Sequence, residues 1–477
     1  MPTRGDPNVN PVRRAALAAF FLATLAVPGL AQAVPPAPSI HQAAPASALP
    51  WPPSPAPRSP SAPPPGPPIS LARAIVMAQA NSPKFQLAVE RAGVASANQT
   101  IARSALLPSL SYNNAYLYTQ GGTGVPVPRF IANNWVHEYT SQAAVHQNLL
   151  GGGLWAGLGV ARAQALLARD QLEVARRGLR LTVTAGYYGL LAAQARLRAA
   201  QRGVAAAQRF AHLSRELQQG GEVALSDVLK AELQLQTAEQ ARRQAALAAE
   251  QARLQLAILL FPDFRPRFRL VNDLAAAPPL PDRARVAALA ASHNPQLGAA
   301  LAGLAAARSG VAQARGAYWP SLSLDYWYGI DAEHFAVRAP NDANPNAPAL
   351  GSAAQVTLNI PVFDWGARAA RLHQAKLAAQ VARVNLSYAQ RALLAQFQAD
   401  YDAARTARRE LQSLQRAQQL ATRSLHLTIL RYQAAAATAL EVVDAQDALV
   451  TATNNLADGE AQYHTALARL QTLTGPF

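Results

Sequence analysis

The pentapeptide LPSLS at Leu107–Ser111 returns as WPSLS at Trp319–Ser323, and this repeat is the strongest guide to the fold. The dipeptide Ser82-Pro83 likewise returns as Asn294-Pro295, and both pairs have the same offset of 212 residues (295 − 83 and 320 − 108). A period this long indicates a duplicated domain half, not the short unit of a solenoid. The two halves are therefore expected to fold alike and to be related by a pseudo-two-fold axis.

The correspondence continues toward the C-terminus of each half. Gly153 matches Gly366 at an offset of 213 residues, and Asp227-Val228-Leu229 matches Glu441-Val442-Val443 at an offset of 214. Almost nothing is therefore inserted or deleted between the halves. The predicted organisation is a signal peptide at residues 1–33, a Pro-rich linker at 34–68, a first repeat at 69–270 and a second repeat at 281–477.

The composition excludes several classes of protein. Only 15% of the 477 residues are charged, whereas about 25% is usual in soluble domains. Cysteine is absent, which excludes disulfides, thiolate metal sites and a lipid-acceptor cysteine. The net charge is +16, but the arginines are spread along Ala-rich segments. A nucleic-acid-binding surface would gather its cations in one patch, so no nucleic-acid binding is predicted.

The N-terminal residues have the pattern of a secretory signal. Arg13-Arg14 is the charged segment and Ala15–Leu30 is the apolar core. Ala31-Gln32-Ala33 is an A-x-A site, after which cleavage is expected. An uncleaved membrane anchor is the alternative. The following segment, Val34–Pro68, is dense in Pro, Ala and Ser and should form an extended linker.

Each half contains two segments with the period-two alternation of a β-strand. The matching positions of the first strands are Leu110, Tyr112, Asn114, Tyr116 and Tyr118 in one half and Leu322, Leu324, Tyr326 and Tyr328 in the other. Return strands are expected around Ser141–Val145 and Ala354–Leu358, and they should end at Gly151–Gly153 and Phe363–Gly366. Each chain therefore supplies four strands.

Tryptophan is concentrated around these strands. Five of the six tryptophans lie in or beside them: Trp135, Trp155, Trp319, Trp327 and Trp365. Indole rings favour a membrane–water interface, where one edge of the ring is wet and the rest is apolar. The alternative is an ordinary aromatic core of a β-sheet.

Long stretches without proline follow the strands and predict two antiparallel helical hairpins. The predicted helices are Ile69–Ala80, a second ending near Ala105, Trp155–Gln218, one from the Gly220-Gly221 turn to Leu260, Ala367–Gln433 and Leu440–Leu473. Hairpins of this length cannot bury a globular core and should pack as coiled coils. Heptad stripes support this, at Val442, Leu449, Leu456, Tyr463 and Leu470 and at Ala445, Ala452, Gly459, Ala466 and Leu473. A strict seven-residue repeat predicts left-handed supercoiling.

Four strands per chain predict an oligomer if the strands cross a membrane. Every backbone polar group must be paired in a bilayer, so a four-stranded sheet with free edges is not viable there. The smallest closed membrane barrels have about eight strands. Several chains must therefore build one barrel, and two, three or four chains would close it.

Over about Ile69–Leu473 the chain resembles the TolC-like outer-membrane efflux protein family. The resemblance rests on the duplicated layout, the two motif pairs above, the FDWG segment Phe363–Gly366, and the helix-tip motifs LSDVL at Leu225–Leu229 and LEVVDAQ at Leu440–Gln446. It implies a membrane α+β fold in which three chains form a 12-stranded transmembrane β-barrel, continued by an α-helical coiled-coil periplasmic tunnel. It also implies a periplasmic adaptor and an inner-membrane pump as partners.

The resemblance places the candidate functional residues at the helix tips. By motif position Glu441 and Asp444 match the family's acidic pair at the constriction, and Asp227 and Tyr432 match its gate aspartate and tyrosine. Three-fold repetition of the acidic pair would place six carboxylates around one narrow ring, which would attract cations.

Two family positions are changed: the usual tip glycine is Ala435 and a frequent gate arginine is Ala437. Arg431 is a candidate replacement for that arginine. A simpler interpretation of the acidic residues remains open. Acidic groups near a helix N-terminus stabilise the helix dipole, and Ser226-Asp227 or Thr438 could be capping residues.

No catalytic constellation is present in the sequence. The nine histidines are scattered, and Gly151–Gly153 lacks the Lys-Ser/Thr of a phosphate-binding loop, so we expect neither an enzyme nor a cofactor or metal. The leading prediction is a passive exit duct for efflux in the outer membrane of a Gram-negative bacterium, in contact with outer-membrane lipid. The alternatives are a duct for type I protein secretion and a coiled-coil structural or adhesin protein without a pore. The transported substrate stays open.

Overall fold

The computed structural model describes residues 68–118, 137–263, 267–332, 335–338 and 348–476. All of them belong to one compact unit, Pro64–Phe477. The predicted signal peptide, the linker apart from Pro68, and Trp135 lie outside the described residues.

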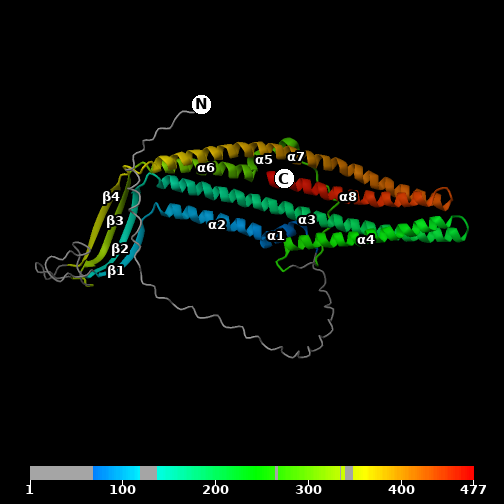
Figure 1. Ribbon diagram of the computed structural model, residues 1–477, viewed down its shortest axis with the longest axis horizontal. Coiled ribbons are helices and arrows are strands. Elements are labelled where there is room, and N and C mark those ends of the chain that lie inside the picture. Colours follow the sequence, from blue (N-terminus) through cyan, green and yellow to red (C-terminus); the bar gives the residue numbers. More distant parts are fainter. Residues whose placement is uncertain (1–67, 119–136, 264–266, 333–334, 339–347, 477) are drawn as a thin grey trace, which may run out of the picture. The chain divides into compact units, whose positions relative to one another are not determined.

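The order of the elements repeats, as the duplicated sequence predicted (Figure 1). The elements are α1 (Leu71–Asn81), α2 (Pro83–Ser104), β1 (Ser109–Tyr118), β2 (His137–Leu150), α3 (Leu154–Gln219), α4 (Leu225–Leu260), α5 (Arg283–His293), α6 (Pro295–Gly316), β3 (Ser321–Ala332), β4 (Leu350–Asn359), α7 (Ala367–Gln433) and α8 (Ala439–Thr474). At about 1.5 Å per residue, the 66 residues of α3 extend about 100 Å.

The repeated Ser-Pro and Asn-Pro motifs are helix starts. Ser82 and Asn294 are the N-caps of α2 and α6, and their side chains accept hydrogen bonds from the backbone N–H groups of Phe85 and Leu297, at 3.4 and 2.9 Å. A side-chain oxygen at this position satisfies an otherwise unpaired helix N–H. The proline that follows is suited to the first helical position, because it has no N–H to leave unpaired.

The four strands form one antiparallel sheet in the order β1-β2-β3-β4, which leaves β1 and β4 at its edges. The register pairs Leu110 with Val145 and Val145 with Tyr326, so the predicted alternation places the apolar positions of different strands on one face. That apolar face includes Leu110, Tyr112, Tyr116, Val145, Tyr326, Tyr328, Val356 and Leu358. The opposite, polar face includes Ser111, Asn113, Gln142, His146, Asp325, Gln355 and Thr357.

The tryptophans do not all share one environment. Trp155, Trp319 and Trp365 beside the strands are largely exposed, as an interfacial girdle predicts. Trp327 instead pairs with Ala144 and Ala353 on the polar face of the sheet, so it does not belong to an outward-facing girdle. A second difference concerns β4, which ends at Asn359 and not at Phe363–Gly366. Proline at position 361 has no N–H to continue the ladder.

The glycines at the end of β2 form the strand-to-helix joint that the sequence predicted. The backbone of Gly152 packs directly on the backbone of Gly316, the last residue of α6. A Cβ built on either glycine would overlap the carbonyl oxygen of the other. The joint therefore requires glycine at both positions, and it holds α3 and α6 together where they leave the sheet.

The long helices lie side by side in one layer (Figure 1). Near the sheet the neighbours are α2 with α3, α3 with α6, and α6 with α7. Toward the hairpin tips they are α4 with α3, α3 with α8, and α8 with α7. The edges of the layer are therefore α7 on one side and α2 and α4 on the other. Among the described residues, no helix is both long enough and apolar enough to cross a membrane.

The predicted heptad stripes of α8 are largely buried. Val442, Tyr463 and Leu470 have no exposed surface, and Ala445, Ala466 and Leu473 are also buried. The burial that the heptad stripes predict for this helix is therefore confirmed.

The segment between the two repeats, residues 267–282, crosses one side of the helix layer; we call it the connector. Its backbone carbonyls accept hydrogen bonds from side chains of three long helices. The pairs are Tyr187 with Val271, His464 with Leu274, Arg408 with Ala277, Tyr463 with Pro278 and Tyr401 with Pro281, at 2.6–3.1 Å. The connector therefore ties α3, α8 and α7 together at mid-length.

Candidate functional site

The two hairpin tips are the turns Gly220–Ala224, between α3 and α4, and Ala434–Thr438, between α7 and α8. Gly221 has a φ of 78°, which glycine adopts at no steric cost. Ala435 has a φ of 53°, in the left-handed region that disfavours a Cβ. The second tip therefore has the conformation that a glycine would favour, although the residue is alanine.

Tyr432, predicted as a gate residue, joins the second hairpin to the first. Its side chain, 2% exposed, comes from the last turn of α7 and reaches α3. The hydroxyl donates a hydrogen bond to Oγ of Ser214 at 3.3 Å, and the ring packs edge-to-face on Phe210 with centroids 5.2 Å apart. Ser214 has no exposed surface. These contacts form the centre of an apolar cluster that includes Leu425, Val442 and Ala445.

A second link between the hairpins was not found from the sequence. Nε2 of Gln234 on α4 donates to Oδ1 of Asp447 on α8 at 2.7 Å. The two residues are 213 apart, within one residue of the repeat offset at the tips. The expected pseudo-two-fold axis between the halves is wrong, because the matched strands β1 and β3 run parallel, with Leu110 and Leu322 on the same face of the sheet. The repeat offset alone therefore could not have revealed this pair.

Arg431 and Glu441 interact within the second hairpin. Nη1 of Arg431 lies 3.4 Å from Oε2 of Glu441, and Nη2 donates to the carbonyl of Ala436 at 2.8 Å. Arg431 thus braces the tip turn from the α7 side. Glu441 also forms a capping box with Thr438, whose backbone N–H donates to Oε1 at 3.1 Å. The capping interpretation therefore holds for Glu441, and it is compatible with a further role for this carboxylate.

Asp444 lies one helical turn after Glu441, and both side chains are exposed. The two carboxylates therefore lie on one side of α8 near its N-terminus, where the helix dipole favours negative charge.

Asp227 lies in the first turn of α4 and contacts Lys230 of the same helix, with Oδ1 3.4 Å from Nζ. Within one chain it makes no hydrogen bond or ion pair to the other hairpin among the described residues. The N-cap of α4 is Ala224, with no side-chain capping bond, so Ser226 and Asp227 do not cap this helix.

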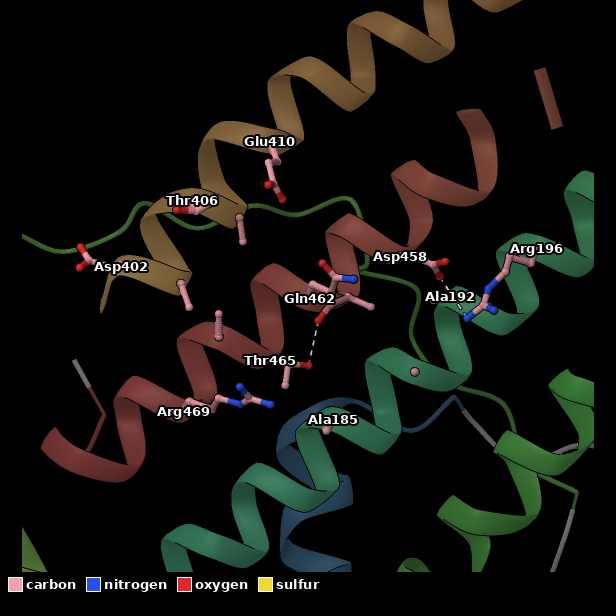
Figure 2. A pocket seen from close by; sticks show the side chains of 15 residues that line it. Ala185, Ala192, Arg196, Asp402, Thr406, Glu410, Asp458, Gln462, Thr465 and Arg469 are labelled. Atoms are coloured by element: carbon pink, nitrogen blue, oxygen red, sulfur yellow. Dashed lines mark hydrogen bonds and ion pairs between the residues drawn. The ribbon is translucent and has the colours of Figure 1, made fainter. Parts of the chain in front are cut away.

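A second site lies at mid-length between α3, α7 and α8 (Figure 2). This pocket of about 780 Å³ is lined by small residues, mostly alanines, and by charged and polar ones. Arg196 on α3 and Asp458 on α8 form an ion pair across it at 3.0 Å. The other polar side chains shown in Figure 2 include Asp402, Glu410, Gln462 and Arg469. Its lining contains three carboxylates and two guanidinium groups, so the charges nearly balance.

The pocket in Figure 2 lies on the side of the helix layer that continues the polar face of the sheet. At the strand-to-helix joint, a pocket of about 550 Å³ is lined by Asn359 of the polar face and by Gly157 of α3. Ala185, four heptads after Gly157 on α3, lines the mid-length pocket. Because residues seven apart stay on one side of a coiled-coil helix, the two pockets lie on the same side of α3. Tyr187 points to the other side, toward the connector. We call the pocket side the inner face and the connector side the outer face.

Comparison with known proteins identifies the class. The model of the outer membrane efflux protein family matches residues 74–260 and 286–476, so the chain belongs to this family. It is 24% identical over 409 residues to the alkaline protease secretion protein AprF of Pseudomonas aeruginosa, covering 84% of this chain and 83% of AprF.

Two solved structures have the same fold. The outer membrane protein VceC of Vibrio cholerae superposes with a TM-score of 0.70 at 18% identity, covering 85% of this chain and 96% of VceC. The Campylobacter jejuni CmeC outer membrane channel gives 0.68 at 19% identity, covering 85% of each chain. The resemblance drawn from the sequence motifs is thus confirmed, and family membership argues against a coiled-coil protein without a pore.

Proposed function

We propose that this protein is the outer-membrane channel of a tripartite efflux system, a passive exit duct filled by an inner-membrane pump through a periplasmic adaptor. The observation that supports it best is the incompleteness of one chain. Both edge strands, β1 and β4, lack a partner on one side among the described residues. Unpaired edges are not tolerated in a bilayer, so β1 of one copy must pair with β4 of another.

The helix layer is incomplete in the same way. On α2 the exposed apolar residues Leu87, Val94 and Ile101 are seven apart, and on α7 the exposed Leu377, Val381, Val384 and Tyr388 have alternating spacings of four and three. These are coiled-coil stripes without a partner among the residues that the structure describes. Because α2 continues the β1 edge and α7 the β4 edge, one neighbouring copy would cover both the strand and the helix edges.

Closure by three copies would give a 12-stranded barrel. Its apolar face would contact the outer-membrane lipid, and its polar face would surround a water-filled lumen continuous with the inner face of the helices. We therefore place the barrel in the outer membrane of a Gram-negative bacterium and the helical part in the periplasm.

The hairpin tips are the proposed gate. The exposed carboxylates of Glu441 and Asp444 would form the acidic ring at the periplasmic entrance, and Tyr432 would hold the second hairpin closed against the first. Arg431 would stabilise the tip turn through Glu441, and Asp227 would act on a neighbouring hairpin.

A second candidate function is supported by one comparison. The similarity to AprF, whose name describes alkaline protease secretion, favours a duct for type I protein secretion as the alternative. An efflux duct and a secretion duct would have the same fold. The inner-membrane partner, and not the duct, would select the cargo.

Native mass measurement of the protein in detergent tests the assembly, with a three-chain species as the expected result. A stable monomer with the full β-signal by circular dichroism would overturn the proposal. Cross-linking in cells followed by affinity purification then identifies the inner-membrane partner. A drug or ion pump would favour efflux, and a protein-secreting ATPase would favour the AprF-like alternative.

A further inference from the structure

A third pocket on the inner face lies between α2, α3 and α6, closer to the sheet than the pocket in Figure 2. Its volume is about 560 Å³. Gln171 and Ala175 of α3 line it, two heptads before Ala185 and Gly189 of the mid-length pocket, so both pockets lie on the same side of α3. We call it the basic pocket.

Two cations line this pocket, and neither has an acidic partner in the described part of the chain. Lys84 and Arg91 are exposed, are seven residues apart on α2, and form no ion pair with any described residue. Their backbone positions are about 10 Å apart along the helix axis, but both side chains are long enough to converge on one ligand. Gln171 and Gln296 add amide groups to the lining.

No carboxylate lines the basic pocket, and the carboxylates closest in sequence to its α3 lining are those of Asp170 and Glu173. Glu173 pairs with Arg176 and Arg177 at 2.9 and 3.0 Å. The carboxylate of Asp170 packs against Gly298 of α6, and burial raises its pKa although Arg169 opposes the shift. Glu90 is next to Arg91 on α2 but forms no ion pair with it or with Lys84, so both cations are unpaired among the described residues. The pocket in Figure 2 differs, because three carboxylates line it.

We propose that the basic pocket is a binding site for a small soluble polyanion bearing phosphate or carboxylate groups. Arg91 would contact an oxyanion with two N–H groups and Lys84 would supply a point charge, the two modes by which these side chains bind such groups. Its location inside a lumen depends on the proposed duct; its binding chemistry depends only on one chain. The inner face would then change from acidic at the tips, through balanced at mid-length, to basic below the sheet. Solutes of either sign would each meet one attractive zone.

Titration calorimetry of the detergent-solubilised protein with inorganic tripolyphosphate at low ionic strength tests the site. We expect saturable binding that weakens as salt is added, because screening reduces the attraction. The variant Lys84→Gln/Arg91→Gln should bind at least about tenfold more weakly, the effect of losing a charge-assisted hydrogen bond.

The matched control is Arg103→Gln/Arg242→Gln, which removes the same charge from two exposed arginines outside the basic pocket. It should retain the wild-type affinity within about twofold, since neither arginine lines the pocket or can contact a ligand bound there. Absence of binding to the wild type, or equal weakening in both variants, would overturn the site. Binding by a protein that never forms a three-chain species would support the site and refute the duct. Three-chain assembly without binding would refute the site alone.

Discussion

The bond between Tyr432 and Ser214 predicts how firmly the hairpins are held together. Changing Tyr432 to Phe keeps the ring against Phe210 and removes only the hydroxyl. Ser214 is completely buried, so its hydroxyl would lose its partner while remaining shielded from water. An unsatisfied buried hydroxyl costs about 1–3 kcal/mol, and the long 3.3 Å bond suggests the lower end of that range.

The cost applies to the closed arrangement, because separation of the hairpins would let water reach Ser214. At about 1 kcal/mol for each of three chains that open together, the ratio of open to closed channels should rise roughly a hundredfold. Planar-bilayer recording of single channels measures this ratio. The control is Ser424→Ala, which removes an exposed hydroxyl from the same helix and should leave the ratio unchanged.

A double-mutant cycle makes the test specific to this pair. Removing both partners, in Tyr432→Phe/Ser214→Ala, leaves no buried group unsatisfied, so the double variant should open less readily than Tyr432→Phe alone. The explanation fails if the single variant has wild-type open probability, or if the double variant opens at least as readily as the single one.

Four further changes have expected outcomes. Ala435→Gly should stabilise the tip by about 1 kcal/mol, because glycine adopts the left-handed conformation without a Cβ clash, and proteolysis at the turn should slow accordingly. Gly316→Ala should prevent correct packing of the strand-to-helix joint, so detergent extracts should contain little three-chain protein; normal assembly would contradict the contact. Glu441→Gln/Asp444→Asn removes both charges but keeps an amide able to cap α8. This variant should lower cation selectivity and cation block in planar-bilayer recordings, with assembly unchanged. Wild-type selectivity would restrict the pair to a helix-terminus role. Burial lowers the pKa of His464 below its usual 6.5, so the unfolded chain binds more protons than the folded chain near that pH. The free energy of unfolding should therefore be full above about pH 6.5 and decrease as the pH drops below it. His464→Gln should flatten that decrease in thermal melts at several pH values.

The sequence by itself determined the elements of this protein, because their causes are local. Pro83 and Pro295, with the capping residues before them, set the starts of two helices. The period of the apolar residues distinguished the strands from the helices. The predicted helix Trp155–Gln218 is α3, Leu154–Gln219, and the prediction Ala367–Gln433 coincides with α7. The tip residues were likewise located by motif, since a turn between two helices is fixed by a few neighbouring residues.

Only the tertiary structure decided which side chains meet. Tyr432 and Ser214 are 218 residues apart, and no local pattern marks a serine on α3 as the partner of a tyrosine on α7. Arg431 contacts Glu441 of its own hairpin, a partner that its motif position did not specify. Trp327 faces the polar side of the sheet because strand register sets the direction of every side chain. Propensity and period act over a few residues, whereas contacts depend on how whole helices and strands pack. The links between the two hairpins are therefore specified only by the folded chain.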